Sequence, residues 1–272
     1  MVKDASRDRP DDAAGVVELA AALEGHQFFL VYQPAIDLQT GAFAGVEALI
    51  RWRHPTRGVL GPDDFLATLA DSDLIAEVGR WVLTTACRQG ALWHRKGYRF
   101  NVSVNVAARQ FARPSFVDDV VGALTQSRFN PAMLTLELAE KSLVKGNRDV
   151  APRLAKIANL GVRIAVDDFA LGRSTLAELE RFPVTSIKLS RASIASVVTT
   201  KRGAARLGEL VAEATAQGVA VIASGVEDAE QRELLATERV AAGQGFLFSR
   251  PHEVAEIDRF LEDFALFSGK PL

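Results

Sequence analysis

The sequence predicts a closed α/β barrel of the TIM-type (β/α)8 class with one antiparallel strand. Apolar strand-like and helix-like segments alternate about seven or eight times with short loops, which is typical of parallel strands joined by crossover helices. Neither the glycine-rich dinucleotide pattern nor the Walker phosphate pattern is present, which argues against an open, doubly wound sheet. The first two strands are a predicted hairpin, so one of them would run against the rest.

Length and composition fit one barrel domain. The chain has 272 residues, of which 48% are hydrophobic and 24% are charged, as in ordinary globular proteins. A net charge of −2 gives no general attraction to a nucleic acid polymer. The sequence has no long uncharged apolar run of the kind that predicts membrane insertion. Cys87 is the single cysteine, so no internal disulfide is possible, and we expect a reducing, cytoplasmic location.

The two ends of the chain differ from its middle. Residues 1–15 are rich in Asp, Arg and Ala without a clear periodic pattern, so we expect a flexible N-terminal arm. We expect the barrel domain to span residues 16–267 and a flexible tail to occupy residues 268–272.

The first half of the barrel domain begins with a helix and a hairpin. Apolar residues at helical spacing over 16–24 end at Gly25, a common helix stop. Apolar stretches at 28–38 and 43–52 flank a turn, which predicts two paired strands. Helical and period-two patterns then predict a short helix at 63–69, a long amphipathic helix at 74–96, a strand at 101–106, a helix at 115–127, a strand at 134–140 and a helix at 149–160.

The second half continues the alternation. Residues 162–169 form a short apolar strand that ends in two adjacent carboxylates, Asp167 and Asp168. The following patterns predict a helix at 175–181, a strand at 186–190, a helix at 202–217, a strand at 219–224, a helix at 228–237, a short segment at 241–244 and a closing helix at 254–267.

Polar side chains lie near the C-terminal ends of several predicted strands, where barrels build their sites. These residues are Glu47, Asn105, Glu137, Asp167, Asp168 and Lys188. Their carboxylates suggest a site for divalent cations, and a solvated Asp-Asp turn that caps a helix is the alternative. By the period of a strand, Glu47 and Arg51 share one face, so a structural ion pair between them is a further alternative. Asn105 is either a neutral ligand or a turn residue.

At Glu47-Ala48-Leu49 the chain resembles the EAL-domain family of cyclic di-GMP phosphodiesterases. The resemblance covers residues 16–267 and rests on several motifs in order. They are Tyr32-Gln33-Pro34, Glu47-Ala48-Leu49-Ile50-Arg51-Trp52, His54-Pro55, Ser103-Val104-Asn105, Leu136-Glu137-Leu138-Ala139-Glu140, Asp167-Asp168-Phe169, Ile187-Lys188 and Gln244-Gly245-Phe246-Leu247-Phe248-Ser249-Arg250-Pro251. The implied fold is a barrel with one antiparallel strand.

The resemblance implies a metal-dependent reaction. Active members use two Mg²⁺ or Mn²⁺ ions to activate a water that cleaves one phosphodiester of cyclic di-GMP, giving linear pGpG. The implied ligands of the first ion are Glu47, Asn105, Glu137 and Asp167, and Asp167 would bridge to a second ion that Asp168 also binds.

The remaining implied roles concern the water and the nucleotide. Lys188 would orient or deprotonate the water, and Glu47 and Asp168 complete the implied catalytic set. Arg51 would contact a phosphate, for which a guanidinium is well suited. Gln33, Leu49, Asp168 and Gln244 would seat the nucleotide, and Glu140 would support the loop after Phe169.

The chain departs from the family pattern at three places. Ser190 and Ser224 stand where the family has acids, and serine is a weaker ligand for a hard cation. In the loop after Phe169 the family's Gly-Thr-Gly is replaced by Ala170-Leu171-Gly172, which has less backbone freedom. A smaller change is Ala139, where the family has threonine. These changes leave the implied first metal site intact and weaken the second.

Three functions remain open at this point. We favour a signalling module that binds cyclic di-GMP at the C-terminal face of the barrel, with weak or no hydrolysis. The second is an active phosphodiesterase, which the retained Lys188 favours. The third is a scaffold that has lost the nucleotide and acts by protein contacts. An effector protein and a homodimer formed through the loop after Phe169 are the macromolecular partners that the resemblance implies.

Overall fold

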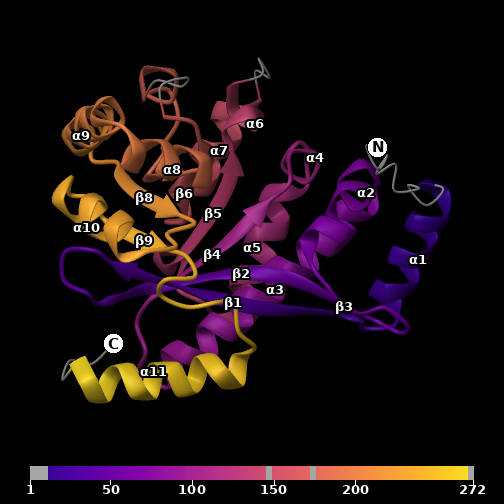
Figure 1. Cartoon of the computed structure of the whole chain (residues 1–272). Helices are drawn as coiled ribbons and strands as arrows, with labels where there is room; N and C mark the ends of the chain where they lie inside the picture. Colours follow the sequence, from indigo (N-terminus) through magenta and orange to yellow (C-terminus); the bar gives the residue numbers. More distant parts are fainter. Residues whose placement is uncertain (1–11, 145–148, 172–175, 269–272) are drawn as a thin grey trace, which may run out of the picture.

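A computed structural model describes residues 12–144, 149–171 and 176–268. Nine strands form one sheet in the order β1-β9-β8-β7-β6-β5-β4-β2-β3, and the additional pairing of β1 with β2 closes it (Figure 1). The strands are β1 Phe28–Asp37, β2 Phe43–His54, β3 Gly58–Leu60, β4 Asn101–Val106, β5 Leu134–Ala139, β6 Arg163–Phe169, β7 Ser186–Leu189, β8 Ala220–Ser224 and β9 Ala242–Gln244. This is the predicted TIM-type barrel of eight strands, with β3 as an extra hairpin strand on β2.

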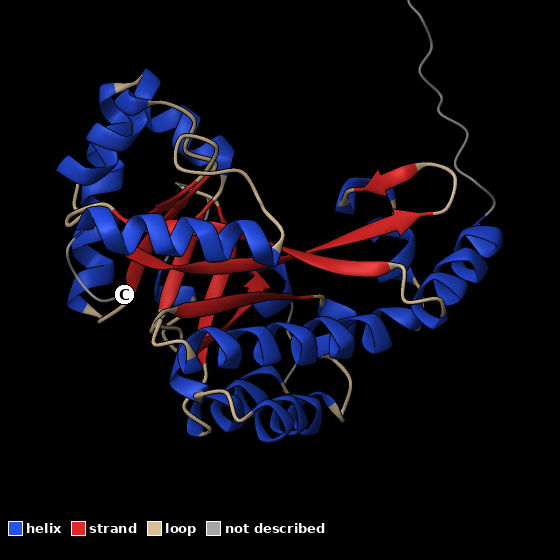
Figure 2. Cartoon of the chain, turned by 90° about the horizontal axis from the view of Figure 1, so that it is seen from below, coloured by secondary structure: helices blue, strands red, loops and turns tan. Residues whose placement is uncertain are grey.

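The antiparallel strand of the barrel is β1. It pairs antiparallel with β2 on one side and with β9 on the other, whereas the pairings from β2 through β4 to β9 are all parallel. The hairpin prediction is therefore confirmed. The hairpin projects past the barrel and carries β3 at its far end, as the view from below shows (Figure 2).

Helices surround the strands on the outside of the barrel (Figures 1 and 2). The α-helices are α1 Asp12–Glu24, α2 Leu66–Asp71, α3 Leu74–Arg95, α4 Ala108–Phe111, α5 Phe116–Ser127, α6 Glu140–Val144, α7 Val150–Asn159, α8 Arg191–Thr199, α9 Lys201–Ala216, α10 Ala229–Thr237 and α11 Val254–Ser268. Three 3-10 turns, η1 Pro62–Asp64, η2 Pro131–Met133 and η3 Leu176–Glu178, complete the set.

Most predicted elements are present, and apart from the start of the first helix their ends lie within three residues of the prediction. The first helix begins at Asp12 instead of residue 16, and residues 1–11 and 269–272 lie outside the described residues. The helix predicted at 175–181 is wrong in its described part, which forms only the turn η3. The helix α8 was not predicted, because Ser, Thr and Val make up much of its sequence and these residues have low helix propensity.

Along a strand, side chains point alternately to the hydrophobic core and to the barrel interior. In β5, Leu134, Leu136 and Leu138 are fully buried among the hydrophobic core residues. The residues between them, Thr135 and Glu137, line a cavity inside the barrel. Period-two geometry places such alternate side chains on opposite faces. The core is therefore the layer between sheet and helices, and the interior carries the polar side chains.

Candidate active site

A buried cluster of one lysine and two glutamates lies at the centre of the site. Lys188 of β7 donates from Nζ to Glu47 Oε2 of β2 at 2.6 Å and to Glu137 Oε2 of β5 at 2.8 Å. The exposed fractions of Lys188, Glu47 and Glu137 are 3%, 8% and 5%. Charged groups this deeply buried are costly unless they are paired. The pairing explains how an apolar sheet accommodates them.

Amide side chains extend the cluster on both sides of Glu47. Asn105 donates from Nδ2 to Glu47 Oε1, and Gln244 donates from Nε2 to Glu47 Oε2 at 2.8 Å. Gln244 also donates to Gln33 Oε1 at 3.1 Å, and Gln33 donates to the carbonyl of Ser249 at 3.1 Å. The fold thus brings six predicted residues from six different strands into one hydrogen-bonded group: Gln33, Glu47, Asn105, Glu137, Lys188 and Gln244.

The two glutamates differ in acidity because their partners differ. Burial acts to raise the pKa of Glu47, but the Lys188 ammonium and the Asn105 and Gln244 amides outweigh it, so this pKa lies below its usual range. Burial and repulsion from Glu47 and Asp167 raise the pKa of Glu137 to about 7, despite its bond to Lys188. Burial also raises the pKa of Asp167. The surroundings of Glu137 and Asp167 therefore favour a bound proton on these carboxyl groups more than the surroundings of Glu47 do.

The adjacent acids of β6 lie in a bulge. Val166 pairs with Ile187 and Phe169 pairs with Leu189, so Asp167 and Asp168 together oppose the single residue Lys188. Asp168 has a left-handed backbone with φ of 57°, a conformation that Asp tolerates better than most residues. Asp167 is half-buried and Asp168 is exposed. The bulge explains how neighbouring side chains of one strand reach the same end of the barrel.

Arg51 is not the ion-pair partner of Glu47. Its guanidinium donates from Nη1 to the carbonyl of Ile50 at 2.8 Å, and within the described ranges it has no carboxylate oxygen within 4.0 Å. It is half-buried, and burial lowers its pKa despite the charges of Asp63 and Glu47. Within the described residues, the structural ion-pair alternative therefore does not hold, and a partly desolvated cation is available on β2.

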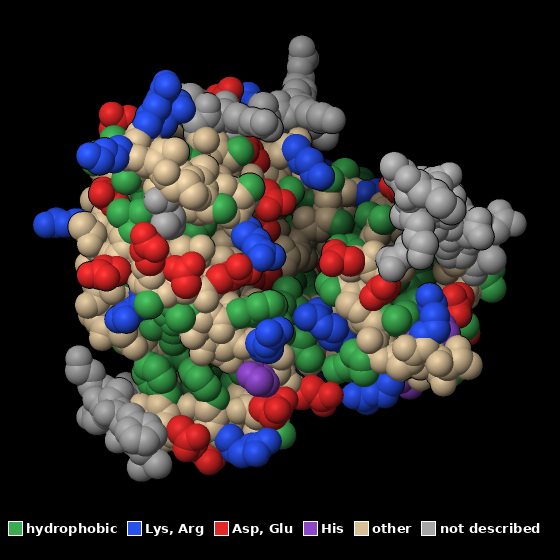
Figure 3. All heavy atoms as spheres, in the orientation of Figure 1, with side chains coloured by type: hydrophobic (Ala, Val, Ile, Leu, Met, Phe, Trp, Pro, Cys, Tyr) green, Lys and Arg blue, Asp and Glu red, His purple; other side chains and the backbone are tan. Residues whose placement is uncertain are grey.

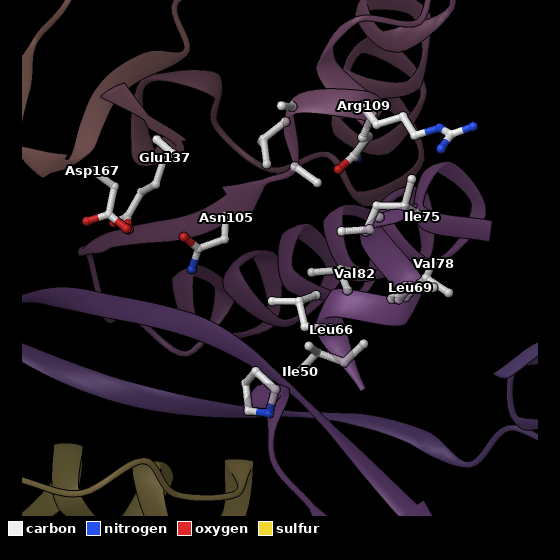
Figure 4. A pocket seen from close by; sticks show the side chains of 18 of the residues that line it. Ile50, Leu66, Leu69, Ile75, Val78, Val82, Asn105, Arg109, Glu137 and Asp167 are labelled. Atoms are coloured by element: carbon white, nitrogen blue, oxygen red, sulfur yellow. The ribbon is translucent and has the colours of Figure 1, made fainter. Parts of the chain in front are cut away.

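A cavity of about 730 Å³ opens beside the cluster. Glu47, Asn105, Glu137 and Asp167 lie at its polar end, and Figure 4 shows the apolar side chains at the other. Those apolar residues are Ile50, Leu66, Leu69, Ile75, Val78 and Val82. In Figure 3 the surface is hollowed between the barrel and the part that carries α1 and α2. The volume of this cavity falls within the range of small-molecule sites.

Leu49 and Asp168 also line this cavity, and their role in seating a nucleotide stays a prediction. The sequence argument missed two further lining residues on α4, Arg109 and Gln110. Arg109 donates to the Asp71 carbonyl at 2.6 Å and so ties α4 to the end of α2. Both follow Asn105 closely along the chain, which is the signal that could have indicated them.

Ser190 and Ser224, the serines that stand where the family pattern has acids, each have a defined structural position. Ser190 caps α8 by accepting from the Ser193 amide at 3.2 Å, and half-buried Ser224 pairs with Gln244 in the sheet. Glu140 begins α6 directly after β5. Gly172 and the three residues after it lie outside the described residues, so the support of this loop by Glu140 stays a prediction.

The donors at the strand ends suit a hard divalent cation. Three carboxylates and an amide oxygen come from β2, β4, β5 and β6, and Asp168 adds a fifth oxygen donor. Lys188 occupies the position between two of the carboxylates, and the described part of the chain contains no ready group of three or more Asp, Glu, His or Cys to hold a metal. The donor types therefore fit Mg²⁺ or Mn²⁺, and the Lys188 ammonium contributes one positive charge to the same carboxylates.

Comparison with known proteins gives a consistent result. A family model described as "EAL domain" matches residues 16–251. The chain is 36% identical over 94% of its length to cyclic di-GMP phosphodiesterase NbdA of Pseudomonas aeruginosa, of which it covers 33%. It is 33% identical over 90% of its length to cyclic di-GMP phosphodiesterase PdeR of Escherichia coli, of which it covers 37%. The chain thus spans about a third of the length of these curated relatives.

A solved structure gives the same result for the fold. The PaMucR phosphodiesterase in complex with c-di-GMP superposes with a TM-score of 0.84 at 35% identity, over 90% of this chain and 99% of that one. An EAL domain protein from Listeria monocytogenes superposes with a TM-score of 0.79 at 29% identity, over 91% of this chain and 97% of that one. Across the described ranges, no helix has the length and apolar character needed to span a membrane.

Proposed function

The chain belongs to the EAL domain family, and we propose that it binds cyclic di-GMP at the C-terminal face of its barrel, with weak or no hydrolysis. In this proposal it is a nucleotide-signalling module that reports the bound second messenger to an effector protein. The complex of PaMucR with c-di-GMP supports the choice of nucleotide. The cavity beside the charged cluster supports the place of binding.

The observation that carries the proposal is the state of Arg51. Its guanidinium is half-buried and lacks a carboxylate partner among the described residues, although Glu47 lies four residues before it. Partial desolvation strengthens the attraction of such a cation for a phosphate, and the planar fork can donate two bonds to it. We assign Arg51 to a phosphate of the nucleotide, with Leu49 and Asp168 at the cavity wall. Gln33 and Gln244 would also seat the nucleotide; Gln244 is bonded to Gln33 and to Glu47.

A divalent cation is part of the proposal. Glu47, Asn105, Glu137 and Asp167 would hold one Mg²⁺ or Mn²⁺ ion, and Asp168 would contribute to a second. When bound, the ions would supply the charge that activates water and neutralises phosphate oxygens. Lys188 holds Glu47 and Glu137 together and would orient the water; the charges of both glutamates raise the pKa of its ammonium despite burial, so it would not take a proton from that water.

Weak hydrolysis follows from the two serines. Ser190 uses its hydroxyl to cap α8, and Ser224 is neutral at the C-terminal end of β8. With serines in place of two acids, fewer negative charges are available to offset the repulsion between two adjacent dications. The second candidate function is an active phosphodiesterase. The assembled set of Glu47, Lys188 and Asp167 favours it, as do the relatives named as phosphodiesterases.

The test combines binding calorimetry with measurement of pGpG release, each with and without Mn²⁺. We expect micromolar or tighter binding of cyclic di-GMP and little release. Rapid release would replace the signalling module with the enzyme, and absence of binding would reject both. Arg51→Ala should weaken binding by about a hundredfold, the loss of a charge-assisted phosphate contact. Arg53→Ala is the matched control, because Arg53 is already paired with Glu253.

A further inference from the structure

The bulge that carries Asp167 and Asp168 is fastened to the rest of the fold by one buried hydroxyl. Ser193, in the first turn of α8, is 7% exposed. Its Oγ accepts from the backbone amide of Leu171 at 3.1 Å and donates to the carbonyl of Phe169 at 3.3 Å. Both backbone groups follow the two acids directly in the chain. The hydroxyl thus bridges two points of the segment in which the bulge ends.

Ser190 belongs to the same network. Its Oγ lies 3.0 Å from Ser193 Oγ and accepts from the Ser193 amide at 3.2 Å, and its own amide donates to the Phe169 carbonyl at 3.4 Å. The two serines therefore join the start of α8 to the end of β6. All donors and acceptors of this bridge are backbone groups or the two hydroxyls.

The geometry of β6 needs such a fastening. A bulge leaves one residue without a ladder partner, and left-handed Asp168 adds a conformation that few non-glycine residues adopt. On the β7 side ladder pairing resumes only at Phe169, the last residue of β6, whereas on the β5 side Asp167 still pairs with Ala139. Beyond it, the described chain continues for two residues, and Leu171 is one of them. Without the Ser193 bridge, the chain after Asp167 would be held by the pairing of Phe169 with Leu189 and by the bond from the Ser190 amide to the Phe169 carbonyl.

We propose that Ser193 is a positioning residue, which fixes the Asp167-Asp168 bulge by bridging the Phe169 carbonyl and the Leu171 amide, with Ser190 as its second hydroxyl. This inference rests on the proposed metal site, because the acids are positioned for a cation. It also gives Ser190 a role: its hydroxyl serves the bridge instead of facing a metal. Ser193 itself touches neither nucleotide nor ion.

The experiment compares Ser193→Ala with the wild-type chain by two readouts. The first is hydrogen exchange of the Leu171 amide, measured by NMR on the protein without metal. The second is the affinity for Mn²⁺, measured by titration calorimetry without nucleotide. We expect Leu171 exchange to become about tenfold faster, as for loss of one hydrogen bond, and Mn²⁺ affinity to fall several-fold. Ser193→Thr keeps the hydroxyl and should restore both values.

Ser196→Ala is the matched control. Ser196 lies on the same helix and donates from Oγ to the Ser193 carbonyl at 2.7 Å, so its removal affects α8 but not the bridge. We expect it to leave Leu171 exchange and Mn²⁺ affinity unchanged. Unchanged Leu171 exchange in Ser193→Ala would overturn the proposal, as would equal loss of Mn²⁺ affinity in Ser196→Ala. A wild-type chain that binds no Mn²⁺ would overturn the proposed metal site, and the exchange readout would still decide whether Ser193 fixes the bulge.

Discussion

Replacement of Lys188 by methionine should destabilise the protein in a pH-dependent way. Lys188 is the one cation bonded to both Glu47 and Glu137 in the described structure, at 2.6 and 2.8 Å. Methionine keeps much of the volume and removes the charge. Glu47 retains its bonds from Asn105 and Gln244, whereas Glu137 loses its ammonium partner. Removing one side of a buried ion pair costs about 3–5 kcal/mol.

The sign of the pH dependence follows from Glu137. Its pKa is raised from 4.5 to about 7 even with Lys188 present, and loss of the ammonium raises it further. A carboxyl with a raised folded-state pKa binds a proton more tightly in the folded than in the unfolded chain. Its protonation therefore favours folding at low pH, and this contribution is lost as pH rises through the folded-state pKa. The cost of Lys188→Met should be smaller at pH 6 than at pH 8.5.

The assay is urea unfolding of both proteins in EDTA at the two pH values. Lys96→Met is the control, because Lys96 pairs with Asp258 at the surface and its side chain is 51% exposed. An exposed pair contributes about 0–1 kcal/mol, so the control should cost little at either pH. A cost of Lys188→Met below 1 kcal/mol, or a cost that does not grow with pH, would refute the idea of a strongly coupled buried cluster.

Two further predictions concern turnover and stability. The double variant Ser190→Asp with Ser224→Glu should increase pGpG release in Mn²⁺ without weakening nucleotide binding, because it restores two acids; unchanged release in a product assay would direct attention to the loop after Phe169. Gly245→Ala should lower the stability by about 1–3 kcal/mol, because a Cβ at this φ of 159° would overlap the Val226 backbone. Gly122→Ala in α5 has room and should be neutral or stabilising in the same thermal scan, and equal effects of the two would contradict the steric argument.

The sequence predicted the barrel and the strands that carry Glu47, Glu137 and Lys188, whereas Glu140, predicted at a strand end, begins the helix α6. Alternation of strand and helix patterns is a local signal, and period two places Glu47 and Glu137 on the interior face. The sequence did not indicate that Lys188 would bond both glutamates, because such contacts depend on how distant strands meet in the closed barrel.

The sequence also did not predict the bulge in β6. The predicted strand 162–169 contains both acids, as β6 does, but its pattern did not indicate the register shift that sets both acids opposite Lys188. The anchor of that bulge, Ser193, lies in the unpredicted helix α8. Its contribution comes from a hydroxyl bonded to backbone groups more than twenty residues away, a contact that leaves no periodic signal.

The barrel interior contains a second cavity, which bears on how the protein should respond to pressure. Below the charged cluster lies a cavity of about 340 Å³, lined by small or polar residues such as Gly45, Ser103, Thr135, Ala165 and Ser186. Barrel interiors are usually filled by bulky branched side chains. A polar space of this size has room for about ten water molecules at liquid density, so we expect water to fill it. Hydrostatic pressure acts on dry voids, and we therefore expect it to have little effect on this half of the molecule.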